Sequence, residues 1–124
     1  MVTNNVGHHR HVDSRLDGPK SAPLDPKLTL ETLHRELGVK RLLLEGGGGA
    51  NGTFLRAGLV DEISLAVCPA VDGAKGAPSV FDSPEQDSEL RAPIAAMSLE
   101  SSEVLDGGTV WLRYRVRNDT PDSL

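Results

Sequence analysis

Four consecutive glycines, residues 46–49, form the part of the sequence whose residue types are best suited to chemistry. They follow an apolar run at residues 42–44 that predicts a short buried strand, and they precede residues 50–57, whose spacing predicts a helix. A strand that breaks into glycine and restarts as a helix exposes backbone N–H groups beside the positive end of the helix dipole. Because glycine has no Cβ, a phosphate can approach that backbone closely. The turn therefore predicts a site for a ligand that carries a diphosphate.

Two common phosphate-binding fingerprints fit this turn poorly. The P-loop spacing that ends in Gly-Lys-Ser/Thr is absent. The dinucleotide spacing Gly-x-Gly-x-x-Gly can be placed on Gly47, Gly49 and Gly52, but four consecutive glycines match many patterns. A tight turn that serves only the structure is therefore an open alternative.

Several segments around and after the turn carry a family resemblance. They are Leu-Leu-Glu-Gly-Gly-Gly at 43–48, Asn-Gly-Thr-Phe-Leu at 51–55, Ala-Gly-Leu-Val-Asp-Glu-Ile-Ser-Leu at 57–65, Val-Asp-Gly-Ala at 71–74 and Val-Trp-Leu-Arg-Tyr-Arg-Val at 110–116. With this combination the chain resembles, from about residue 30 to residue 116, the C-terminal reductase domain of the bacterial riboflavin-biosynthesis deaminase-reductase. That domain belongs to the dihydrofolate reductase-like superfamily.

The resemblance implies an NADPH-dependent oxidoreductase that acts on a ribosylaminopyrimidine or a pterin-like heterocycle. The open alternative is a catalytically inactive, truncated remnant that only binds a nucleotide or dimerises. Hydride transfer needs no protein nucleophile, so no residue is assigned a catalytic role and no metal is expected. The resemblance implies that the cofactor diphosphate lies against the turn and is bound by Gly46, Gly47, Gly48, Gly49, Ala50 and Asn51.

Two polar side chains beside the glycines have open alternatives. Asn51 could cap the helix or reach the ligand, and we favour the cap. Glu45 ends an apolar run, where burial of an unpaired carboxylate would be costly. The resemblance directs Glu45 toward the substrate; alternatively it accepts hydrogen bonds from nearby backbone amides and fixes the turn.

Other residues that could do chemistry have simpler interpretations. Arg113, Arg115 and Arg117 alternate along the last apolar run and could bind an anion, although an exposed sheet face or a subunit contact is favoured. Cys68 lies in an apolar run and is expected to be a buried small residue. A cluster of histidines near the N-terminus, His8, His9 and His11, is expected to be incidental.

The elements that would position the turn follow from local signals. Asp25 or Thr29 could begin a helix that carries Leu30, Leu33 and Leu37 on one face, with Gly38 as its end and Gly58 as the end of the next helix. Residues 62–69 predict an interior strand, and residues 71–93 predict a long surface loop that Val80 and Phe81 dock back onto the body of the protein.

Residues 97–105 and 109–116 predict a hairpin joined through Asp106-Gly107-Gly108. The expected fold class is therefore α/β, with a mixed sheet flanked by helices and a C-terminal β-hairpin. The resemblance implies part of a three-layer dihydrofolate reductase-like fold.

The chain divides into three expected parts: a flexible N-terminal segment, 1–26; the C-terminal part of a reductase-like domain, 27–118; and a disordered tail, 119–124. No segment resembles the first strand and helix of the reductase domain. Exposed strand edges would then favour a homodimer or association with a complementary N-terminal half.

Length and charge narrow the class of protein. A chain of 124 residues is a single domain at most. A net charge of −5 argues against non-specific nucleic-acid binding, and no apolar run approaches the length of a membrane span. With no signal-peptide pattern at the N-terminus, a cytoplasmic protein with a small-molecule substrate is expected.

Overall fold

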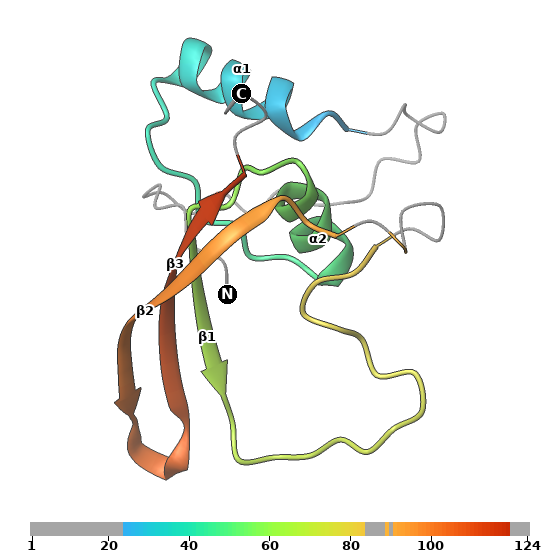
Figure 1. Cartoon of the computed structure of the whole chain (residues 1–124), viewed down its shortest axis with the longest axis vertical. Coiled ribbons are helices and arrows are strands. Elements are labelled where there is room, and N and C mark those ends of the chain that lie inside the picture. Colours follow the sequence, from blue (N-terminus) through green and yellow to red (C-terminus); the bar gives the residue numbers. More distant parts are fainter. Residues whose placement is uncertain (1–23, 84–88, 90, 120–124) are drawn as a thin grey trace.

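The computed structural model of the chain describes residues 24–83, 89 and 91–119. Its elements in chain order are α1 (Pro26–Leu37), α2 (Gly48–Arg56), β1 (Glu62–Val67), β2 (Ile94–Val104), a short 3₁₀ turn (Asp106–Gly108) and β3 (Val110–Asn118) (Figure 1). The α/β class with a C-terminal hairpin is confirmed. The expected flexible segment 1–26 and tail 119–124 fall almost wholly outside the described residues.

Helix α1 begins and ends where its capping residues predict. The Asp25 carboxylate accepts hydrogen bonds from the backbone N–H groups of Lys27 and Leu28, at 3.0 and 3.2 Å. Gly38 ends the helix with a φ of 64°, in the left-handed region that favours glycine. The apolar face predicted for this helix, with Leu30, Leu33 and Leu37, does not extend to its last residue, however, because Leu37 is 72% exposed.

Helix α2 begins at Gly48, inside the glycine run and two residues before the expected start. It ends in a Schellman motif: the N–H of Gly58 donates to the carbonyl of Leu55, and the N–H of Leu59 donates to that of Phe54, both at 3.1 Å. Gly58 has a φ of 68°, so its predicted role as the end of this helix is confirmed.

The predicted strand at residues 42–44 is wrong. Within the described residues, Leu44 has isolated strand-type pairing, and Leu42 and Leu43 belong to no strand. A strand requires a neighbour along its length, which a short apolar run cannot specify alone. Leu42 and Leu44 instead pack against the core as extended chain.

The described sheet has the order β1-β3-β2, and both of its strand pairs are antiparallel, which corrects the expectation of a mixed sheet for this part of the chain. Strand β3 is central, so the prediction that β1 is an interior strand does not hold within this sheet. Cys68 lies just after the last residue of β1 and is exposed, which corrects the expectation that it is buried. Cys68 has no strand partner opposite it, because the β1–β3 pairing ends at Val67 and Val110.

The hairpin is confirmed, although β2 begins at Ile94, three residues before the expected start. Gly107 and Gly108 both have positive φ, 80° and 83°, and the N–H of Leu105 donates to the carbonyl of Thr109 at 2.8 Å. The Asp-Gly-Gly sequence therefore closes the hairpin as its residue types predict.

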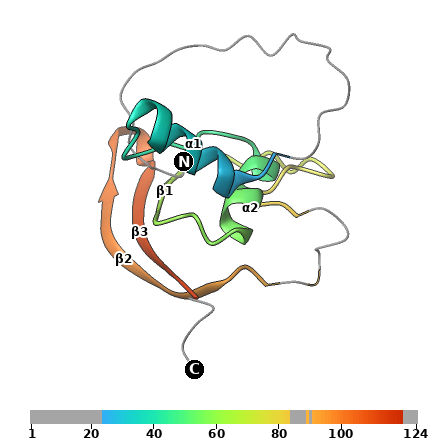
Figure 2. The ribbon, with the colours of Figure 1, turned by 90° about the horizontal axis from the view of Figure 1, so that it is seen from above.

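Helix α2 lies on one face of the sheet, while α1 lies beyond one end of the sheet (Figures 1 and 2). The buried core joins α2, β1 and β3. Its buried members are Phe54, Val60, Ile63 and Val116. Residues 71–83 contain no helix or strand, as expected for a loop, and Phe81 docks against this core. The core thus positions the start of α2 and the end of this loop side by side.

Candidate functional site

The glycine run places the start of α2 at the surface. Gly47 is the N-cap residue, with φ −71° and ψ 174°, and within the described residues no side chain caps the helix. The first turn also contains no acidic residue. The N–H groups of the first helical residues therefore face outward at the positive end of the helix, which is the arrangement that attracts an anion.

The glycines of this segment are not equivalent. A Cβ on Gly48 or Gly52 would collide with the backbone of Ser79 or Asp82. A Cβ on Gly47 or Gly49 would meet nothing within 4 Å in the described part of the chain. Packing therefore requires glycine at 48 and 52, whereas the turn is open to an approaching ligand at 47 and 49.

Gly46 and Ala50 lie on one side of the turn. A Cβ on Gly46 would lie 2.9 Å from the Cβ of Ala50, closer than side chains tolerate. Glycine at 46 is therefore explained by the local path of the chain, and Ala50 is an exposed residue of the first helical turn.

Asn51 does not cap the helix, because Gly47 occupies the N-cap position and Asn51 lies one turn inside α2. Its side chain is only 5% exposed. The amide nitrogen Nδ2 donates to the carbonyl of Gly46 at 3.2 Å and to that of Val80 at 3.0 Å. Among the described residues, Oδ1 has no hydrogen-bond partner. Asn51 therefore connects the turn to a segment 29 residues further along the chain.

Glu45 precedes the glycines and is exposed. The desolvation cost that would have required a partner for this carboxylate therefore does not arise. The carboxylate lies at the edge of the turn, and its contact with a substrate stays a prediction.

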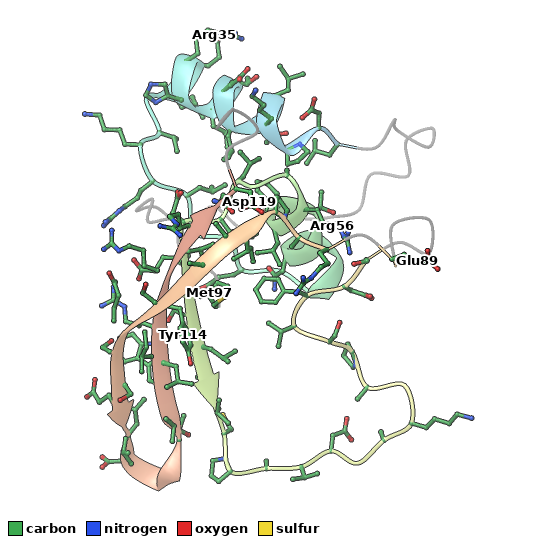
Figure 3. The ribbon with its side chains drawn as sticks, viewed as in Figure 1. Arg35, Arg56, Glu89, Met97, Tyr114 and Asp119 are labelled. Carbon is green, nitrogen blue, oxygen red and sulfur yellow. The ribbon has the colours of Figure 1, made fainter. Side chains whose placement is uncertain are left out.

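A short segment of the loop, residues 79–83, crosses directly over α2. The N–H of Asp82 donates to the carbonyl of Gly48 at 2.9 Å, and Arg56, at the end of α2, hydrogen-bonds Ser83 (Figure 3). Sequence reasoning assigned these residues to a surface loop and missed their contact with the turn. The sequence signal for this contact was the apolar pair Val80-Phe81 within an otherwise polar stretch.

An apolar cavity of about 310 Å³ lies between α2, this crossing segment and the sheet. Its lining includes Leu55, Phe81, Met97 and Tyr114, the last two from neighbouring strands (Figure 3). The lining residues carry no charged group, so the cavity is not suited to a phosphate.

The opposite face of the sheet is polar, and two of its arginines are paired. Arg113 lies 2.7 Å from Glu62, and Arg115 lies 2.5 Å from Glu100. The hydrogen bond and the charge of Glu62 raise the pKa of the Arg113 guanidinium above its ordinary value. Because these charges are compensated within the sheet, the stripe favours an exposed sheet face over an anion site.

The described residues contain no group of three or more His, Cys, Asp or Glu side chains that could hold a metal ion. His8, His9 and His11 lie outside them. In the part of the chain that the structure describes, no helix has the length and apolar character to cross a membrane.

Comparison with known proteins places this geometry in a family. The profile of the RibD C-terminal domain matches residues 3–111, so the match begins well before residue 30, where the resemblance was expected to begin.

Two curated relatives carry the name 2,5-diamino-6-ribosylamino-4(3H)-pyrimidinone 5′-phosphate reductase. The one from Methanothermobacter thermautotrophicus is 41% identical over 59 residues, which is 48% of this chain and 27% of that protein. The one from Archaeoglobus fulgidus is 43% identical over 53 residues, or 43% of this chain and 24% of that protein.

A solved structure gives the same picture of the fold. A pyrimidine reductase-like protein from Corynebacterium diphtheriae superposes with a TM-score of 0.65 and 26% identity, covering 78% of this chain and 37% of that one. This likeness confirms the dihydrofolate reductase-like α/β fold. The chain thus spans about a quarter of the length of the two curated relatives.

Proposed function

Because the chain belongs to the RibD C-terminal domain family, we propose that it takes part in the NADPH-dependent reduction of a ribosylaminopyrimidine phosphate or a pterin-like heterocycle. Two relatives are named as reductases of such a phosphate, and a structural neighbour is described as pyrimidine reductase-like. In this proposal the glycine turn binds the diphosphate of the cofactor.

The observation that carries the proposal is the open side of the turn at Gly47 and Gly49. The packing of the described chain explains glycine at 46, 48 and 52 but gives no steric reason for glycine at 47 and 49. Close approach of a ligand to the backbone supplies that reason, and the uncapped start of α2 lies at the same place.

The residues present fit a dinucleotide diphosphate. The backbone N–H groups of Gly48, Gly49 and Ala50 would hold it, since they begin a helix that no described side chain caps and that has no carboxylate in its first turn. When bound, the cofactor supplies a hydride, and the chain's own part is to bind and orient the reactants. Glu45, exposed at the edge of the turn, would face the pyrimidine or ribose part of the substrate.

Steady-state oxidation of NADPH by the purified chain, with a ribosylaminopyrimidine 5′-phosphate as substrate, tests the proposal. We expect turnover that Gly49→Leu abolishes and that Ala57→Leu, an exposed substitution at the other end of α2, leaves unchanged. Absence of turnover with every ribosylaminopyrimidine and pterin substrate tried, by a chain that is folded, would contradict the reductase activity.

A second candidate function is nucleotide binding or dimerisation without turnover. It is favoured by the apolar face of the sheet beyond α2, where Val67, Leu99 and Val104 are 48%, 55% and 76% exposed. Large contiguous apolar patches on a protein surface mark sites of contact with another molecule. A dimer in analytical ultracentrifugation, together with NADPH binding and no turnover, would favour this candidate; a turnover that is proportional to enzyme concentration would exclude it.

A further inference from the structure

The end of the long loop is fastened to the glycine turn at several points. Nδ2 of Asn51 donates a hydrogen bond to the carbonyl of Val80, and the N–H of Asp82 donates to the carbonyl of Gly48. The guanidinium of Arg56 donates to the hydroxyl of Ser83. The close approach of this segment to α2 depends on glycine at 52, where no side chain fits. We call residues 79–83, held in this way, the crossing segment.

The turn therefore has two sides with different neighbours. On one side, Gly48 and Gly52 face the crossing segment. The other side, at Gly47 and Gly49, is open within the described chain. A ligand bound on the open side and the crossing segment packed on the other side would both contact the same short stretch of backbone.

Asn51 occupies the point where the two sides meet. Its Nδ2 has two hydrogens, and the two carbonyls that accept from it belong to the turn and to the crossing segment. A carboxylate of the same shape would offer no donor to either carbonyl. The burial of the side chain leaves little room for water to take the place of the amide.

We infer that Asn51 is a positioning residue that locks the crossing segment to the glycine turn and couples the order of the loop to the occupancy of the turn. This inference rests on the proposed function for its ligand, because it takes a dinucleotide diphosphate as the occupant. It adds that the loop responds to that ligand, which neither the fold nor the relatives' names imply.

Ahead of the crossing segment, the loop residues that the structure describes, 71–78, are all exposed. Within the crossing segment, Phe81 packs against the core. A change in the path of residues 46–48 is therefore transmitted to the loop through the crossing segment. Coupling is reciprocal, so a loop that is firmly fastened also holds the turn in its binding conformation.

Hydrogen–deuterium exchange of the full chain, with and without saturating NADPH, tests the inference, and inorganic pyrophosphate serves as the minimal probe. We expect NADPH to slow exchange at residues 76–83 in the wild-type chain. Asn51→Asp should speed that exchange in the free chain, abolish the NADPH-dependent protection and raise the Kd for NADPH about tenfold.

Asn118 supplies a matched control, because its Nδ2 also donates to a backbone carbonyl, that of Val60, at 3.0 Å, and its Oδ1 is likewise buried. Asn118→Asp should lower stability but keep both the NADPH affinity and the loop protection. If Asn51→Asp does not fold, Asn51→Ser, whose shorter side chain cannot reach both carbonyls, replaces it.

The outcomes separate the inference from the function on which it rests. If wild-type chain binds NADPH without protection of residues 76–83, or if Asn51→Asp keeps that protection, the inference is overturned and the proposed function stands. If the wild-type chain binds neither NADPH nor pyrophosphate, the proposed function fails and the coupling fails with it. In that case, faster exchange at residues 76–83 in ligand-free Asn51→Asp than in ligand-free Asn118→Asp would support only the fastening of the loop to the turn.

Discussion

Gly52 lies directly under the backbone of Asp82, so close that a Cβ on Gly52 would overlap the Asp82 carbonyl. Residues 30 positions apart thus meet without a side chain between them, and α2 packs against the loop by backbone contact. The consequence is that glycines in one short segment have opposite sensitivities to substitution.

Substitution by alanine should distinguish a glycine that packs against the loop, Gly52, from one that faces open space, Gly49. Gly52→Ala should destabilise the chain by about 1–3 kcal/mol, because the loop must move away from α2. Gly49→Ala, which meets open space inside the helix, should stabilise it by about 0.5–1 kcal/mol. Urea unfolding followed by circular dichroism measures both, and equal effects at the two positions would contradict the crossing of the loop over α2.

The small core makes Phe54 a sensitive position. Phe54 is 8% exposed and belongs to the buried apolar core of the described residues, so Phe54→Ala should cost about 3–5 kcal/mol. The control is Leu37→Ala on α1, at a side chain that is 72% exposed, which should change the free energy of unfolding very little. If Phe54→Ala leaves the free energy of unfolding nearly unchanged, α2 does not pack on the sheet as described.

The ion pair between Arg113 and Glu62 predicts a dependence on salt and not on pH in the neutral range. Because the charge and hydrogen bond of ionised Glu62 raise the folded-state pKa of Arg113, the contribution of this pair is constant through the neutral range and is lost on the alkaline side only as the pH rises through that high pKa. Glu62→Gln should lower stability slightly, and added salt should shrink the difference from wild type. Unfolding curves at low and high ionic strength check this. A difference that salt does not change would argue against a charge interaction.

Exposure of Cys68 predicts ready chemical modification. The thiol is the only one in the chain and lies outside the strand, so a thiol reagent should react in the native protein nearly as fast as in urea. Reaction that becomes fast only after unfolding would mean that Cys68 is covered, for example by a second chain.

The parts of the fold that could be predicted from the sequence are those that local signals determine. Asp25, Gly38 and Gly58 lie at helix ends where their capping chemistry places them, and the Asp-Gly-Gly turn closes the hairpin. Each of these depends on the backbone within a few residues.

The features that could not be predicted depend on neighbours far along the chain. Whether Leu44 continues as a strand and whether β1 is interior are decided by which segments lie beside them. In the candidate site, the glycine turn was found from its residues, but the roles of Gly48, Asn51 and Gly52 required knowledge of where residues 79–83 pass.

Calorimetric titration of the purified chain with NADPH tests whether the open side of the turn binds a dinucleotide diphosphate. NADH and pyrophosphate are compared, and Gly49→Leu and Ala57→Leu are titrated beside the wild type. We expect saturable binding that Gly49→Leu weakens by at least about tenfold, through loss of close approach to the backbone, and that Ala57→Leu preserves. No binding by the folded wild-type chain, or equal binding by Gly49→Leu, would contradict it.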